Sequence, residues 1–137
     1  MKNNILLFLF IISPLFACTQ KTAEDYYNLA VKETNMQKRI ELLDKAIALN
    51  PDYFAAVYRR AEEFYKITVS LHGICTAGED KDYYRKSVHD YTEAIRLQPT
   101  NGELYCTRSG IEGLMGDTAK ANQDILKAHS LGYNSCK

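Results

Sequence analysis

Apolar side chains recur at a helical interval along most of the chain after residue 22. Spacings of three and four residues place such side chains on one face of an α-helix. Two stripes of this kind are clearest: Ile40, Leu43, Ala46 and Ile47, and then Tyr84, Val88, Tyr91, Ala94 and Ile95. No strongly alternating run of β-branched residues accompanies them. The pattern therefore predicts an all-α domain.

Residues that break helices divide this pattern into six segments. Pro51 and Pro99 end two of them, because a proline pushes the preceding residue out of helical geometry. The expected helices span residues 23–34, 36–50, 54–71, 80–98, 101–115 and 118–131. The connection at residues 67–81 is the least ordinary, and it is read either as a contact loop or as two lengthened helices with a short tip.

Three local signals refine the helix ends in the C-terminal third. Thr100 and Glu103 fit a capping box, with Thr100 as N-cap. Asp117, after Gly116, is an expected N-cap, and Gly132 is an expected C-terminal stop.

The chain also repeats itself. The segment from Ala46 to Pro51 is echoed by the segment from Ala94 to Pro99, and more loosely by residues 128–133. Self-similarity at such intervals is typical of stacked helical hairpins. We therefore divide residues 23–137 into units at about 23–51, 52–99 and 100–133.

These units resemble tetratricopeptide repeats (TPRs). The residues that carry the resemblance are the small or aromatic positions and the closing prolines: Leu29, Ala30, Ala46, Pro51, Ala61, Phe64, Ser87, Ala94, Pro99, Tyr105, Arg108, Ser109, Ala121 and Ala128. The sequence departs from the family pattern at two places. Pro51 and Pro99 lie 48 residues apart, against a repeat of about 34 residues, and Arg39 stands where a small residue is expected.

The resemblance implies a function in protein binding. In this family the first helices of the repeats line a concave groove that takes a peptide or a helix. The corresponding residues here are Tyr27, Tyr58, Glu62, Tyr65, Glu103, Cys106 and Leu114. Tyrosines suit interfaces, although packing between helices is the alternative reading for them. Tyr58 and Glu62 stand where chaperone-binding members need Lys and Asn, so we exclude that ligand class.

The N-terminus has the layout of an export signal. Lys2 precedes the apolar run 5–12, which is shorter than the roughly 20 residues of a membrane span. The segment from Leu15 to Cys18 resembles a bacterial lipobox, in which cleavage after Ala17 leaves a lipidated Cys18. An ordinary signal peptide is the alternative. Residues 1–17 are then the signal peptide and residues 18–22 a tether to the envelope membrane. Thr19 favours the outer membrane, facing the periplasm, by resemblance to Gram-negative sorting rules.

Composition narrows the class of function. Without Lys2 the mature part carries 16 basic and 17 acidic residues, which gives no basic surface for nucleic acid. No phosphate loop, serine elbow or zinc-protease motif is present, so we expect no enzyme and no cofactor beyond the lipid on Cys18. His72 and Cys75 alone are too few for a metal site.

Three cysteines remain after Cys18 is assigned to the lipid: Cys75, Cys106 and Cys136. Cys106 and Cys136 fall at neighbouring ends of one expected hairpin, which makes them the favoured pair for a disulfide in an oxidising compartment. Three unbonded thiols are the reading that we place ahead of this pair, because the geometry of a disulfide is strict.

Together these patterns predict a membrane-tethered module that binds a protein partner of the cell envelope. The alternative is a structural lipoprotein that forms homo-oligomers through the sixth helix or through the 67–81 hairpin.

The lipobox reading leads to a direct test. Replacing Cys18 with Ala removes the lipid acceptor, so the variant should stay unprocessed and lose its membrane association. Membrane fractionation with mass spectrometry of the N-terminus checks both effects. Normal membrane retention of this variant contradicts the lipobox.

Overall fold

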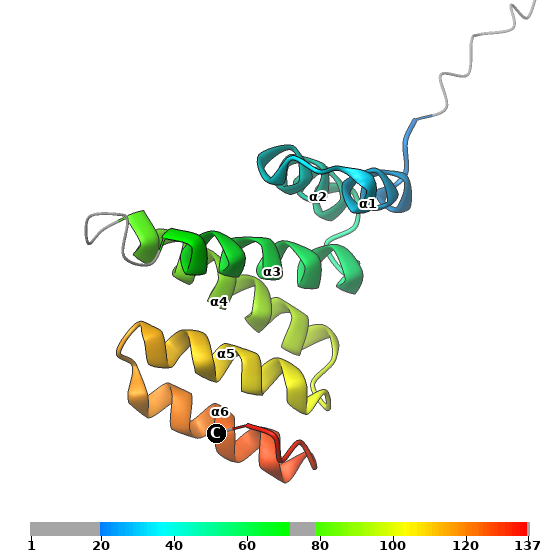
Figure 1. The fold of residues 1–137 in the computed structure, drawn as a ribbon. Coiled ribbons are helices and arrows are strands. Elements are labelled where there is room, and N and C mark those ends of the chain that lie inside the picture. The colour runs from blue at the N-terminus through cyan, green and yellow to red at the C-terminus, as the bar shows by residue number, and fades with distance from the viewer. Residues whose placement is uncertain (1–19, 72–78, 137) are drawn as a thin grey trace, which may run out of the picture.

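The computed structural model describes residues 20–71 and 79–136, which form six α-helices. The helices are α1 (Ala23–Lys32), α2 (Met36–Leu49), α3 (Phe54–Leu71), α4 (Glu79–Leu97), α5 (Gly102–Leu114) and α6 (Thr118–Ser130). They pair as α1–α2, α3–α4 and α5–α6, and the three hairpins stack in chain order (Figure 1). The all-α, three-hairpin prediction is confirmed. We call α1, α3 and α5 the A helices and α2, α4 and α6 the B helices.

Side-chain caps set several helix ends. Asp117 caps α6 as expected, and its carboxylate accepts a hydrogen bond from the backbone N–H of Lys120 at 3.3 Å. Gly132 follows α6 with φ of 84°, a conformation that glycine adopts without steric cost. Thr22 and Asp25 form a capping box at α1 that the sequence analysis did not identify.

Two predicted boundaries were wrong. The N-cap of α5 is Asn101 and not Thr100, because the Asn101 side chain accepts from the N–H of Glu103 at 3.2 Å. Helix α1 ends at Lys32 and not at residue 34. The carbonyl oxygens of Glu33 and Thr34 are instead turned toward the guanidinium of Arg39, which donates to both.

The extra length of the middle unit lies largely in its helices. Helices α3 and α4 have 18 and 19 residues, longer than the other four. This agrees with the reading of lengthened helices. Residues 72–78 lie outside the described part of the chain, and with them His72, Ile74 and Cys75.

Small residues allow the helices to approach closely. Ala30, Ala46, Ala61, Ala94 and Ala128 are all fully buried. Each lies at a position that the TPR resemblance assigned to a small residue, and the prediction for these positions is confirmed. Close-packed interiors tolerate no larger side chain at such contacts without strain.

Arg39 replaces a small residue without leaving a charge unpaired. Its guanidinium lies 2.5 Å from the carboxylate of Glu63, which is fully buried in α3. Arg59 and Lys66 also contact Glu63, at 3.2 and 3.3 Å. The departure from the family pattern is therefore an ion-pair link between α2 and α3.

A second kind of ion pair recurs between equivalent positions of the second and third units. Arg60 donates two hydrogen bonds to Asp90 in α4, at 2.7 and 2.8 Å, and one to Asp44 in α2, at 2.7 Å. Arg108 likewise donates two bonds to Asp124 in α6, at 2.7 and 2.8 Å. Its third bond goes to Thr92 in α4, at 2.9 Å. Each arginine thus ties an A helix to its own B helix and to the preceding one.

The first unit has an apolar counterpart of this pair. Leu29 precedes the small residue Ala30, as Arg60 precedes Ala61, and Leu42 lies four residues before Ala46, as Asp90 lies before Ala94. Leu42 packs against the core beside Ala46. The paired charges are therefore confined to hairpins that have a preceding B helix.

Replacing Arg60 with Ala should destabilise the fold strongly. Asp90 is only 2% exposed, and removing one partner of a buried pair leaves an uncompensated charge, at a cost of about 3 kcal/mol. Urea denaturation followed by circular dichroism measures this change. Arg96→Ala is the matched control, because Arg96 and Asp52 form an exposed pair and little change is expected. Equal effects of both variants would contradict the role of Arg60.

Candidate protein-binding face

The predicted binding residues fall at equivalent places on the A helices. Tyr27, Tyr58 and Cys106 each lie three residues before the small residue of their helix. On α3, Tyr58, Glu62 and Tyr65 follow one face by their spacing of four and then three residues. We define the A-helix face as the side of α1, α3 and α5 that carries Tyr27, Tyr58, Glu62, Tyr65 and Glu103.

Tyr58 is held firmly at the centre of this face. Its ring is stacked on Phe54, with centroids 5.7 Å apart, and meets Tyr91 edge to face at 6.0 Å. Tyr91 belongs to α4 and is 2% exposed, whereas Tyr58 is half-buried. Both readings of Tyr58 therefore apply in part, since the ring packs against the core and still keeps an accessible portion.

Two acidic side chains influence the tyrosine hydroxyls electrostatically. Burial is the main cause of the raised pKa of Tyr58, and the negative charges of Glu62 and Glu103 add to it. The pKa of Tyr91 is raised further, by burial first and then by Tyr58, Glu62, Tyr65 and Glu103. These phenols therefore stay protonated and keep a hydrogen to donate. The charges of Glu62 and Glu103 therefore act on both Tyr58 and Tyr91.

The first unit also combines aromatic rings with a carboxylate. Tyr27 meets Tyr53 edge to face, with ring centroids 5.3 Å apart. Burial raises the pKa of Tyr53, and the charge of Glu24 raises it further. The sequence analysis missed Tyr53 because it lies in the turn before α3, outside any repeat position. Its place directly after Pro51-Asp52, where the next A helix begins, was the available signal.

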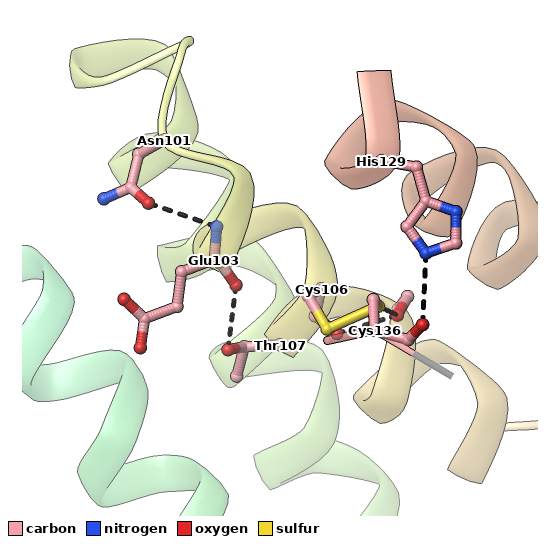
Figure 2. Close-up of a disulfide and its surroundings, with 7 residues drawn as sticks. Asn101, Glu103, Cys106, Thr107, His129 and Cys136 are labelled. Carbon is pink, nitrogen blue, oxygen red and sulfur yellow. Dashed lines mark hydrogen bonds between the residues drawn. A yellow bond between two sulfur atoms is a disulfide. The ribbon is translucent and has the colours of Figure 1, made fainter. Parts of the chain in front are cut away.

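The third unit differs from the other two. Cys106 is bonded to Cys136, with the Cα atoms 5.4 Å apart, so its sulfur is bonded within the chain (Figure 2). Glu103 is exposed one turn earlier on the same helix. Leu114 lies at the other end of α5 and is 52% exposed. Glu103 is therefore the residue of α5 that we include in the A-helix face.

The segment after α6 packs back against α5 and α6. Cys136 is 6% exposed, its sulfur lies 3.5 Å from the hydroxyl of Ser109, and its carbonyl oxygen lies 3.1 Å from the His129 ring. The chain turns back after Gly132 and runs beside α6 (Figure 1). A Cβ at Gly102 would lie 2.6 Å from Cβ of Tyr133, so the tail also requires glycine at the start of α5.

Two cavities lie between helices at equivalent places in the second and third units. One has a volume of about 400 Å³ and is lined by Arg60, Phe64, Arg85, Lys86, His89 and Asp90. The other has a volume of about 270 Å³ and is lined by Val88, Thr92, Arg108, Glu112, Lys120, Gln123 and Asp124. Each contains the Arg–Asp pair of its unit, which is engaged in holding the helices together.

Glu112 is the unusual residue of the smaller cavity. It is 5% exposed, and its Oε2 has no hydrogen-bond partner among the described residues. Burial raises the pKa of this carboxyl, and the nearby charge of Asp124 raises it further.

No group of three or more metal-ligating side chains occurs within residues 20–71 and 79–136. The described helices also include none that is long and apolar enough to cross a membrane.

Comparison with solved structures identifies the fold. The chain superposes on two crystal structures of the protein MamA with TM-scores of 0.65 and 0.64, at 22% and 24% sequence identity. These matches cover 80% and 81% of this chain and 54% and 58% of the MamA chains, so it spans little more than half their length.

A third structure has a similar size. The second TPR domain of Spaghetti (RPAP3), bound to the HSP90 peptide SRMEEVD, matches with a TM-score of 0.62 and 20% identity. The match covers 81% of this chain and 93% of that domain. No protein-family model matches the chain, and no curated protein sequence matches it. At these identities the similarity establishes the fold alone, which is TPR-like.

The disulfide should contribute substantially to stability. Its cysteines are 30 residues apart, and closing a loop of this length restricts the unfolded chain by about 3 to 4 kcal/mol. The double variant Cys106→Ser, Cys136→Ser should therefore unfold at lower urea concentration. Dithiothreitol should lower the wild-type midpoint to that of the variant and leave the variant unchanged. A wild-type midpoint insensitive to dithiothreitol would contradict this.

Proposed function

We propose that this chain is a TPR-type interaction module that binds a segment of a protein partner on its A-helix face. The observation that carries the proposal is the half-buried ring of Tyr58, which is fixed against Phe54 and Tyr91 and is influenced by the charges of Glu62 and Glu103 from two successive A helices. Tyrosines anchored on a core lose little conformational entropy on binding and offer both an apolar ring and a hydrogen bond. Such a surface suits a peptide segment better than a small metabolite, which usually needs an enclosed pocket.

The partner differs from the ligand of the RPAP3 domain. That domain was solved with a peptide that ends in Glu-Val-Asp. The negative charges of Glu62 and Glu103 would repel such carboxylates. Tyr58 also stands at a position where a carboxylate-binding member of the family would need a lysine. This supports the exclusion of a carboxylate-binding role.

We further propose that the module is tethered to a bacterial envelope membrane through a lipid on Cys18. The sequence from Leu15 to Cys18 is the basis of this proposal, and Ala17 and Cys18 lie outside the described residues. The Cys106–Cys136 disulfide supports an oxidising compartment, where such bonds persist. The proposed location is the outer membrane, with the module facing the periplasm.

Self-association through α6 is the second candidate. Leu126 is 69% exposed on α6, which is the terminal helix of the stack. Burial of this apolar side chain against another copy of the chain would be favourable, which supports self-association through α6.

In-cell crosslinking separates the two candidates. A photoreactive residue replaces Tyr58 on the A-helix face, or Lys127 on the exposed side of α6 as the matched control. We expect the Tyr58 probe to capture one dominant envelope protein that the Lys127 probe does not capture, as identified by mass spectrometry.

Two other results would count against this proposal. Capture of the chain itself, mainly from Lys127, would favour self-association, and a size measurement on Leu126→Glu would then show loss of the dimer. Equal capture of unrelated proteins from both positions would reject a specific A-helix face.

A further inference from the structure

The aromatic rings of this protein fall into two groups that differ in their contact with cations. Lys21 and Lys45 lie 5.7 and 5.8 Å from the ring centroid of Tyr26. Phe64, Tyr83 and Tyr105 also have Lys or Arg over their rings, at 5.0 to 5.9 Å. None of these four rings belongs to the A-helix face. Their cations all come from the chain itself.

The tyrosines at the A-helix face have no Lys or Arg over their rings among the described residues, although the charge of Arg59 partly offsets the rise in the pKa of Tyr58. Within residues 20–71 and 79–136, no Lys or Arg side chain lies over the ring of Tyr27, Tyr53, Tyr58 or Tyr65. Three of these rings contact other rings instead, because Tyr27 meets Tyr53, and Tyr58 meets Phe54 and Tyr91. Tyr65 packs against the core. Their remaining surface is therefore available to a cation from outside.

Negatively charged side chains influence these rings. The charge of Glu24 raises the pKa of Tyr53 in the first unit. The charges of Glu62, from the second unit, and Glu103, from the third, raise the pKa of Tyr58. Glu24 and Glu103 are exposed and form no ion pair with another described residue.

The cations nearest to this face are already engaged. Arg59 lies 3.3 Å from Glu62 and 3.2 Å from the buried Glu63, and Lys66 lies 3.3 Å from Glu63. Glu63 holds Arg39 as well, and Arg59 also reaches Glu62 on the A-helix face. Among the described residues, the carboxylates near these rings that form no ion pair are therefore Glu103, which acts on Tyr58, and Glu24, which lines a pocket with Tyr53.

We infer that the A-helix face binds a positively charged segment of its partner, with a Lys or Arg side chain seated on Tyr58 beside Glu103, while Glu62 adds a carboxylate that it shares with Arg59. A second cation is placed at Tyr27 and Tyr53 beside Glu24. A cation over a tyrosine ring with a carboxylate at its edge gains from both the ring quadrupole and a charge-assisted hydrogen bond. This inference rests on the proposed function and specifies the chemistry of the partner.

Selection from a library of random linear peptides tests the charge preference directly. The purified full-length chain is immobilised, and bound peptides are sequenced. We expect enrichment of Lys and Arg and depletion of Asp and Glu. The selected peptides should bind the double variant Glu62→Gln, Glu103→Gln at least about tenfold more weakly than the wild type, measured by fluorescence anisotropy.

The matched control is Glu41→Gln, which removes an exposed carboxylate from α2 and should leave the affinity unchanged. Both glutamine substitutions on the face keep the side-chain shape, and circular dichroism checks that the variants fold. If Glu41→Gln weakens binding as much as the double variant, the effect is general electrostatics and the inference falls.

The outcomes for the inference and for the proposed function are distinct. Peptides that bind through Tyr58 without a basic bias, or with an acidic one, overturn the charge preference and leave the binding module intact. A selection that enriches no peptide dependent on Tyr58 overturns both. A basic bias that survives in the double variant overturns the assignment to Glu62 and Glu103.

Discussion

The stacking of each hairpin on the next is the constraint on which this structure depends. No hairpin encloses its own core. Ala56 of α3 completes the core of the first hairpin, and Leu104 and Ile111 of α5 complete that of the second. Fully buried alanines at the helix contacts allow the backbones to approach closely, so that side chains of one hairpin can reach the core of the preceding hairpin. The Arg60 and Arg108 ion pairs span the same junctions and penalise any change in the order or angle of the helices.

The candidate site is a consequence of that stacking. Equivalent positions of successive A helices are brought to one side, so Glu103 of α5 comes near Tyr58 of α3 although they are far apart in the sequence. The internal ion pairs also decide the charge of this side. Glu63 holds Arg39, and Arg59 is shared between Glu63 and Glu62, so Glu103 is the carboxylate of the A-helix face that forms no ion pair with another described residue.

The third hairpin is linked covalently to the segment that follows it. The described part of this segment, up to Cys136, lies against α5 and α6. The disulfide engages Cys106, which occupies the position of Tyr27 and Tyr58, so the third unit contributes a carboxylate and no ring to the A-helix face.

The sequence by itself determined the helices, the hairpins and the repeat positions, because helical periodicity, prolines and small residues act locally. It also indicated Tyr58, Glu62, Tyr65 and Glu103, whose places follow from the repeat. It misplaced the α5 cap, because Thr100 and Asn101 are both good caps and the turn after Pro99 decides between them. Only the tertiary structure decided that Arg39 is paired with Glu63, that Tyr53 joins Tyr27, and which rings already hold a cation. Those pairings depend on side chains meeting across helices, and no local pattern specifies such distances.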